Sequence, residues 1–201
     1  MRAVVLDWGG VLTRTPTRRS WRAVADSCGF EADEFEVAWA RHRRGYDCGE
    51  LSAAEYWRLV GIENSRLADV LEADAAAWSR PNRAIVKWLS RLRAAGLRTA
   101  LLSNVPREQW GRLAPIYESS VASCNELVLS FEIGCAKPEA RMYEQCLERL
   151  AVSPEEALFV DDVPANVEAA AALGMQAVQY QSVSGLRAEL RSRFGSELPL
   201  P

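Results

Sequence analysis

The run AVVLDWGGVL at residues 3–12 constrains the fold more than any other stretch of the chain. It begins with apolar residues, as a buried β-strand does, and Asp7 interrupts it just before Gly9 and Gly10. Glycine lets the backbone turn sharply, and open α/β sheets place reactive groups in the crevice outside the carboxyl ends of their strands. We therefore predict a strand that ends at Asp7 and a nucleophilic role for its carboxylate.

Beyond residue 81 the sequence alternates between helical and extended patterns. Apolar residues at helical spacing predict helices over residues 85–92, 138–150, 164–173 and 183–194, with Pro138 in the first turn of the second. Short apolar runs predict strands at residues 97–102, 127–131, 157–160 and 177–180. An irregular helical stretch is expected at residues 107–117, and residues 197–201 are expected to be frayed. This alternation is typical of a doubly wound parallel sheet, a Rossmann-like α/β core.

Residues 15–80 show helical spacing and no strand pattern. Four apolar stripes predict four short helices, and glycines between the stripes suit reversals between antiparallel helices. We expect one α/β domain formed by residues 1–14 and 81–201, with a four-helix subdomain at residues 15–80. Core packing explains the tryptophans of this region better than a substrate pocket or a dimer surface does: Trp21, Trp39, Trp57 and Trp78.

Composition narrows the class of protein. The 201 residues are 49% hydrophobic and carry a formal net charge of -3, which argues against a nucleic-acid partner. No apolar run reaches the roughly 20 residues that span a bilayer, and five cysteines without a metal-binding spacing indicate reduced thiols. We expect a cytoplasmic protein without membrane contact, with a homodimer left open. The arginines of the loop and the helical region are interpreted as solvated: Arg14, Arg18, Arg19, Arg41, Arg43 and Arg44.

Acidic residues follow two of the predicted strands. Asp7 follows the first, and Asp161 and Asp162 follow the run at residues 157–160. The carboxyl ends of parallel strands meet at one edge of a sheet, and Mg²⁺ prefers oxygen ligands. We therefore predict that Asp7, Asp162 and the backbone carbonyl of Gly9 hold Mg²⁺. Asp161 would complete or orient that shell.

Groups that could bind a phosphate are placed in the same way. Ser103 and Asn104 follow the second strand, and Lys137 lies on the loop before a helix. Each has an ordinary structural alternative as a helix cap or a helix start. Together with Asp7 they supply what phosphoryl transfer to a carboxylate needs. Ser103 and the amide of Asn104 would donate to the phosphoryl oxygens, and Lys137 would supply a positive charge to the phosphate and to Asp7.

Four segments, in the same order along the chain, resemble the motifs of the haloacid dehalogenase superfamily of phosphohydrolases. They are DWGGVL, LLSN, AKPEARMYE and FVDDVPANVEAAAALGM. The resemblance implies a Mg²⁺-dependent phosphatase of a small phosphorylated metabolite, acting through an aspartyl-phosphate. It also implies that the helical insertion is a cap that selects substrate. The segment YDCGELSAAEYW at residues 46–57 resembles the cap loop of one branch, so Asp47 and Glu50, with Trp8, are candidates for substrate contacts.

Position 9 departs from the family pattern. Phosphatases of this superfamily generally carry a second Asp two residues after the nucleophile, which protonates the leaving group, and here that residue is Gly9. General acid catalysis typically contributes about 10²- to 10⁴-fold. We therefore expect a preference for leaving groups of low basicity, such as aryl, acyl or anomeric phosphates. Asp47, Glu50 or an ordered water are the candidate substitutes.

Two other classes of function remain as alternatives. Without its usual acid, the chain could be a non-catalytic or weakly catalytic phosphoryl-binding regulator. A dehalogenase would use the same Asp7 as its nucleophile. Displacement of a halide needs no metal, however, and the adjacent Asp161 and Asp162 indicate that a metal is bound. Phosphonate hydrolases of this superfamily have a first motif that resembles the Asp7-Trp8 pair here, but they use a lysine of the cap. The lysines of this chain, Lys87 and Lys137, lie outside the cap.

Overall fold

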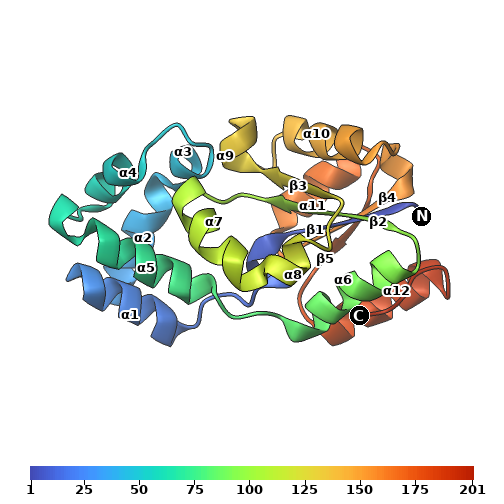
Figure 1. Cartoon of the computed structure of the whole chain (residues 1–201), viewed down its shortest axis with the longest axis horizontal. Coiled ribbons are helices and arrows are strands. Elements are labelled where there is room, and N and C mark those ends of the chain that lie inside the picture. The colour runs from blue at the N-terminus through green and yellow to red at the C-terminus, as the bar shows by residue number, and fades with distance from the viewer.

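A five-stranded parallel sheet forms the centre of the protein in the computed structural model. The structure describes the backbone of residues 1–201 and all side chains except those of Ser27, Ala32 and Asp33. The strands are β1 (Ala3–Leu6), β2 (Arg98–Ser103), β3 (Glu126–Leu129), β4 (Ala157–Asp161) and β5 (Gln176–Gln179). They are ordered β3-β2-β1-β4-β5 (Figure 1). This confirms the doubly wound α/β fold, and each expected strand is found within one or two residues.

Helices cover both faces of the sheet because successive residues of β1 point to opposite sides. Val4 and Leu6 pack on the face covered by α6 (Arg83–Ala94) and α12 (Val183–Phe194). Ala3 and Val5 pack on the face covered by α10 (Ala140–Leu150) and α11 (Pro164–Ala172). Figure 1 shows these helix pairs on opposite sides of the sheet. All four residues of β1 are fully buried, as expected for a central strand of a parallel sheet.

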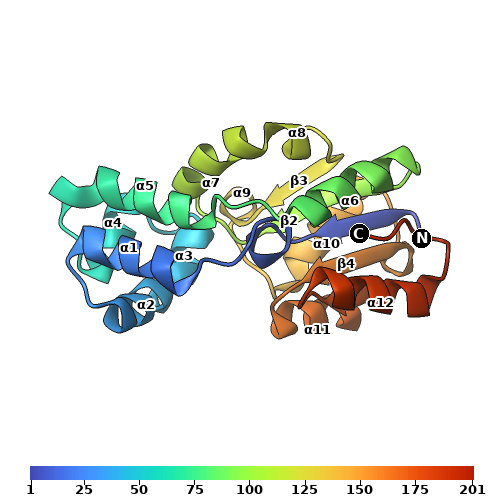
Figure 2. The same ribbon diagram turned by 90° about the horizontal axis from the view of Figure 1, so that it is seen from below.

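Five helices form the region that we call the helical cap, residues 15–80. They are α1 (Arg18–Cys28), α2 (Ala32–Arg41), α3 (Arg43–Asp47), α4 (Ala53–Val60) and α5 (Leu67–Trp78). They enclose a core of their own around Phe35, Tyr56 and Trp57 and lie to one side of the sheet (Figure 2). Four helices were expected; α3 is the additional one, because the chain breaks at His42 after α2.

Two backbone segments join the helical cap to the sheet, and they pair with each other. Thr13 and Pro81 form an antiparallel bridge. The Arg14 amide donates to the Arg80 carbonyl at 2.8 Å, and the Asn82 amide donates to the Leu12 carbonyl at 2.9 Å. Directly before this junction, Trp8–Leu12 forms a turn, η1, in which the Thr13 amide donates to the Trp8 carbonyl at 2.8 Å. The entry to the cap is therefore fixed close to the end of β1.

Shorter elements fill the connections between the main strands and helices. They are η2 (Asn64–Arg66), α7 (Arg107–Leu113), η3 (Ala114–Tyr117), α8 (Glu118–Val121), α9 (Ser130–Ile133) and η4 (Pro154–Glu156). The irregular helical stretch expected at residues 107–117 is thus confirmed. None of the helices in the described residues combines the length and the apolar character that crossing a bilayer requires.

Two expectations about local structure were wrong. Pro138 lies before α10, which begins at Ala140, so the segment from Lys137 to Glu139 is a turn. The last residues are not frayed: Leu198 is buried in the main core, and the indole of Trp88 donates to the Pro199 carbonyl. Both differences arise from contacts between distant segments, which local sequence patterns do not report.

Candidate active site

Three predicted site residues lie at the carboxyl ends of adjacent strands. β1 pairs with β2 on one side and with β4 on the other. Asp7 therefore lies between Ser103, the last residue of β2, and Asp161, the last residue of β4. β1 is the strand at which the winding direction of the sheet reverses, and such switch points form the binding crevice of open α/β sheets.

Lys137 joins the acidic residues at this crevice. Its Nζ atom lies 2.7 Å from Asp7 Oδ1 and 2.7 Å from Asp161 Oδ2, and its side chain is buried. Burial lowers the pKa of Lys137, but the charges of Asp7 and Asp161 outweigh burial and raise it. Lys137 therefore stays a cation at the centre of the site.

The side chain of Asn104 fixes the loop that carries this lysine. Asn104 Oδ1 accepts from the Lys137 amide at 2.8 Å, and Asn104 Nδ2 donates to the Lys137 carbonyl at 2.9 Å. This pair of hydrogen bonds fixes the backbone of Lys137 beside Asn104, which directly follows β2. The side chain of Asn104 thus has a structural role, which leaves its backbone amide as the group predicted to bind phosphate.

Sequence reasoning missed Asn166, which holds Asp161 in place. Asn166 Nδ2 lies 3.1 Å from both carboxylate oxygens of Asp161, and the Val163 amide donates to Asp161 Oδ1 at 2.8 Å. Asn166 is on the first turns of α11, five residues after Asp161 in the fourth quoted motif. Its position within that motif was the signal that could have identified it.

Asp7, Asp161 and Asp162 form a cluster suited to a cation. One carboxylate oxygen from each lies within 4.8 Å of the others. Among the described side chains, Lys137 alone forms ion pairs with this cluster, so three carboxyl groups face one ammonium group. The all-oxygen donor set and the unbalanced negative charge fit Mg²⁺.

Burial raises the pKa of Asp7 to about 8, helped by the charges of Asp161 and Asp162 and opposed by Lys137. Burial likewise raises the pKa of Asp162. A bound divalent cation reverses such shifts, because it stabilises the ionised carboxylates. The arrangement of charges is therefore the one that a metal ion would complete.

The two glycines after Asp7 meet different neighbours. Gly10 has a φ of 77°, and a Cβ there would lie 2.2 Å from Asp162 Oδ2. Gly9 has ordinary backbone angles, but a Cβ there would lie 3.2 Å from the ring of Trp78, the last residue of α5. The backbone of Gly9 could thus accommodate a side chain, and the ring of Trp78 takes up the space beside it.

A cavity of about 250 Å³ opens onto the acidic cluster. Its walls include Asp7, Ser103, Asn104 and Lys137 from the sheet side, and Trp39, Arg43, Asp47 and Trp78 from the helical cap. Trp8 and Gly9 also line it. Two of the tryptophans assigned to core packing, Trp39 and Trp78, thus face the cavity, whereas Trp57 is buried in the cap core.

Two of the three residues predicted to contact the substrate line the cavity, and the third does not. Trp8 and Asp47 line the cavity. Glu50 does not: it is exposed and lies 3.5 Å from the Nη1 atom of Arg44 on the outer surface. Glu50 lies in the turn after α3 and is exposed to solvent.

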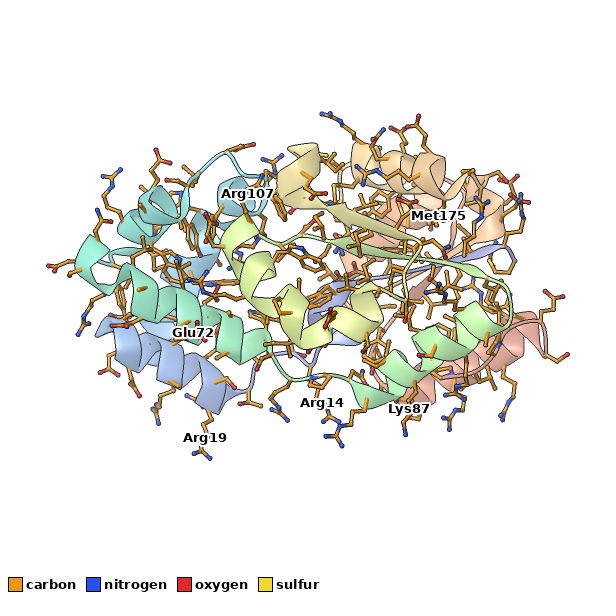
Figure 3. All side chains as sticks on the ribbon, viewed as in Figure 1. Arg14, Arg19, Glu72, Lys87, Arg107 and Met175 are labelled. Atoms are coloured by element: carbon orange, nitrogen blue, oxygen red, sulfur yellow. The ribbon has the colours of Figure 1, made fainter. Side chains whose placement is uncertain are left out.

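Arg43 was also placed wrongly by the sequence interpretation, which assigned it to a solvated face. Its side chain is 12% exposed, and its guanidinium carbon lies 4.4 Å from the centre of the Trp39 ring. Nε lies 2.8 Å from Asp47 Oδ1, Nη2 donates to Gln109 Oε1 at 2.6 Å, and Nη1 lies 3.6 Å from Asp74 Oδ2. The other arginines of that group are exposed, and Figure 3 shows Arg14 and Arg19 at the molecular surface.

Two contacts join α3 to the sheet side next to the cavity. The hydroxyl of Ser130, at the start of α9, donates to the Asp47 carbonyl. Arg44 Nη2 lies 2.6 Å from Glu139 Oε1, on the turn that carries Lys137. Figure 1 shows α3 beside α9.

Comparison with known proteins identifies the family. A doubly wound sheet with acidic residues at its switch point defines a class of α/β proteins with a site for charged ligands. The family model for haloacid dehalogenase-like hydrolases matches residues 1–174. The chain therefore belongs to the haloacid dehalogenase-like family and is a hydrolase.

Individual relatives are distant. Acyl-CoA dehydrogenase family member 10 of Mus musculus is 28% identical over 99% of the chain, which spans only 20% of that protein. D-ribitol-5-phosphate phosphatase of Bacteroides thetaiotaomicron is 26% identical over 94% of the chain and 97% of its own length.

A solved structure supports the fold. It is a haloacid dehalogenase family enzyme from Bacteroides thetaiotaomicron in complex with magnesium and inorganic phosphate. It superposes with a TM-score of 0.76 at 21% identity, covering 90% of this chain and 94% of that one.

Proposed function

We propose that the protein is a Mg²⁺-dependent phosphatase of a small phosphorylated metabolite, acting through an aspartyl-phosphate on Asp7. One observation carries this proposal. The Asp7 carboxylate faces the same cavity as Ser103, Asn104 and Asp162, with Lys137 Nζ 2.7 Å from its Oδ1 atom. A nucleophile, a cation and hydrogen-bond donors thus surround one small volume, as phosphoryl transfer requires.

Each group has a role in the reaction. The Asp7 carboxylate attacks phosphorus, Lys137 neutralises charge on the phosphate, and Ser103 with the Asn104 amide donates to the phosphoryl oxygens. Asp7, Asp162 and the carbonyl of Gly9 would hold Mg²⁺. Bound there, the ion would neutralise the phosphate and align it with the nucleophile.

Asp161 acts through other groups. Both of its carboxylate oxygens are hydrogen-bonded, to Lys137, Asn166 and the Val163 amide. It therefore positions Lys137 and adds negative charge beside the predicted metal.

The relatives and the cavity support the same class of substrate. The D-ribitol-5-phosphate phosphatase matches along nearly its whole length, and the solved relative was crystallised with magnesium and inorganic phosphate. A cavity of about 250 Å³ accommodates a phosphate and a few further atoms rather than a macromolecule. All five cysteines are free thiols, which supports a location in the reducing cytoplasm.

The test is release of inorganic phosphate from a panel of small phosphate esters. With Mg²⁺ the protein should turn over at least one of them, and EDTA should abolish turnover. Asp7→Asn should reduce the rate by about 10³-fold or more, whereas Asp69→Asn, on the exposed side of α5, should not change it. Equal activity of Asp7→Asn and the wild type would overturn the proposal.

The alternatives give different signals. A non-catalytic phosphoryl-binding protein incubated with acetyl phosphate and Mg²⁺ would keep one phosphoryl group, visible by intact mass. A dehalogenase would release halide from a 2-haloacid in the presence of EDTA. The proposed phosphatase should show neither a persistent adduct nor release of halide.

A further inference from the structure

We propose that Asp47, supplied by the helical cap, is the general acid that protonates the leaving oxygen, in place of a side chain at position 9. This inference rests on the proposed phosphatase function. It adds a catalytic residue that lies about 40 residues along the chain from the nucleophile and in a different part of the fold.

Asp47 is the remaining candidate for the acid among the side chains that line the cavity. The titratable side chains that line the cavity are Asp7, Arg43, Asp47, Lys137 and Asp162. Asp7, Asp162 and Lys137 serve as nucleophile, metal ligand and phosphate-binding cation. Arginine does not release its proton in proteins. Asp47 is the one described carboxyl group on these walls without another role.

Asp47 is also held close to the phosphate-binding loop. The Ser130 hydroxyl donates to the Asp47 carbonyl and accepts from the Val105 amide at 2.9 Å. Val105 directly follows Ser103 and Asn104, the predicted phosphate donors. The charge of Lys137 also acts on the Asp47 carboxyl group. Two hydrogen bonds through one side chain therefore connect the proposed acid to the phosphoryl end of the cavity.

Arg43 orients the carboxyl group. Its Nε atom lies 2.8 Å from Asp47 Oδ1, and the guanidinium is fixed by Gln109 on α7 and by the ring of Trp39. Asp47 Oδ2 has no hydrogen-bond partner among the described residues. One oxygen is thus anchored, and the other is left to carry a proton toward a ligand.

The local charges favour a protonated carboxyl group. Two buried carboxyl groups, Asp47 and Asp74, share the single guanidinium of Arg43. If both ionise, one negative charge is unbalanced in a poorly solvated place. Burial accordingly raises the pKa of Asp47, with Asp74 adding to the rise and Arg43 opposing it. The titratable and charged groups that interact with Asp47 are Arg43, Cys48, Tyr56, Asp74 and Lys137.

The proton balance of the reaction is complete. As Asp7 forms its bond to phosphorus, the bond from phosphorus to the leaving oxygen breaks, and that oxygen takes the proton of Asp47. Alcohol leaves, and Asp47 is now a carboxylate. Water then attacks the aspartyl-phosphate and gives a proton to Asp47, while the electron pair of the broken P–O bond returns to Asp7. Inorganic phosphate and the starting enzyme result.

Two substrates of nearly equal size test the proposal with Asp47→Asn. In 4-nitrophenyl phosphate the leaving group is a weakly basic phenoxide that needs no proton, and in 4-nitrobenzyl phosphate it is a strongly basic alkoxide. Single-turnover release of the alcohol isolates the first step. Asp47→Asn should slow 4-nitrobenzyl alcohol release by about 10²- to 10⁴-fold, and 4-nitrophenol release by less than about tenfold. Glu50→Gln, at the exposed neighbour, should change neither rate.

The outcomes are distinguishable. An equal loss with both substrates would mean that Asp47 only positions or stabilises the cap, and no loss with either would mean that another group donates the proton; both overturn the inference. If the wild-type protein releases neither alcohol and no ester of the panel is hydrolysed, the proposed function itself fails. Turnover of panel esters together with an Asp47→Asn defect confined to the alkyl ester would support both.

Discussion

The ring of Trp78 lies 3.2 Å from the point that a Cβ on Gly9 would occupy. Gly9 stands where the family resemblance leads us to expect an acid, and Trp78 is the last residue of α5, two residues before the helical cap ends. Position 9 thus has no acidic side chain, and the ring of Trp78 lies in the space beside it. The cap fills the space beside Gly9 with an apolar wall.

Restoring the acid should require removal of the ring. Gly9→Asp alone should lower the free energy of unfolding by about 1–3 kcal/mol, because the new side chain overpacks against Trp78. Gly9→Asp combined with Trp78→Ala should lose less than the sum of the two single changes. Urea unfolding of the four proteins measures this coupling. Strictly additive losses would show that the contact does not constrain position 9.

Gly10 should be required for the metal site. Gly10→Ala places a Cβ against the Asp162 carboxylate and strains a positive φ, whereas Gly96→Ala strains a similar φ of 80° with no atom within 4 Å. Both should cost about 1–2 kcal/mol of stability for the backbone. Only Gly10→Ala should also weaken Mg²⁺ binding measured by calorimetry. Equal Mg²⁺ affinity in the two variants would argue against Asp162 as a ligand.

Lys137 should stabilise the fold as well as serve the reaction. Lys137→Met leaves Asp7 and Asp161 without their cation in a buried place, and breaking a buried ion pair typically costs about 3–5 kcal/mol. Lys87→Met is the matched control, because Lys87 lies on the exposed face of α6 (Figure 3) and should change stability by less than about 0.5 kcal/mol. Urea unfolding without Mg²⁺ makes the comparison. Similar stabilities would contradict the buried ion pairs.

Asp74→Asn should shift the pH dependence of the reaction. The proposed acid must be protonated, so the rate with an alkyl ester should fall as the pH rises through the raised pKa of Asp47. Removing the Asp74 charge lowers the pKa of Asp47, so this falling limb should move to lower pH. Asp74 contacts Trp39, Arg43 and Gln109, which the amide of Asn can still meet in part. If the falling limb of the pH–rate profile stays at the same pH, Asp47 is not the group whose titration lowers the rate.

The same variant has a consequence for stability. The pKa of Asp74 is raised by burial, so its protonated form favours the folded state. That contribution is present below the ordinary carboxyl pKa and is lost as the pH rises through the raised value. Asn stays neutral at every pH. The stability of Asp74→Asn relative to the wild type should therefore increase as the pH rises from the ordinary carboxyl pKa of about 4 through the raised value, as measured by unfolding at each pH.

The sheet and the acidic residues at the carboxyl ends of its strands could be predicted from sequence because their signals are local. The run before Asp7 and the one before Asp161 are apolar for four residues or more, and a carboxylate directly follows or ends each strand. Once strands and helices alternate, the parallel topology brings these ends together. The cluster of Asp7, Asp161 and Asp162 follows from that topology.

The cavity wall on the cap side could not be predicted in the same way. Arg43 looks like one of several solvated arginines, and its burial depends on Gln109 and Asp74, which are 66 and 31 residues away along the chain. The spacing of four residues between Arg43 and Asp47 was the one local signal of their pairing. The packing of Trp78 against Gly9 and the burial of Leu198 are likewise contacts between distant segments.

The hydrogen bond from Ser130 to the Asp47 carbonyl crosses between the two parts of the protein. The acidic cluster and Lys137 belong to the sheet side of the protein. Asp47 is the last residue of α3 and belongs to the helical cap. If the cap swings away to admit a substrate, the nucleophile stays in place and the proton donor departs. Closure of the helical cap would then control the rate of both half-reactions, because neither proton transfer can occur while Asp47 is away from the site.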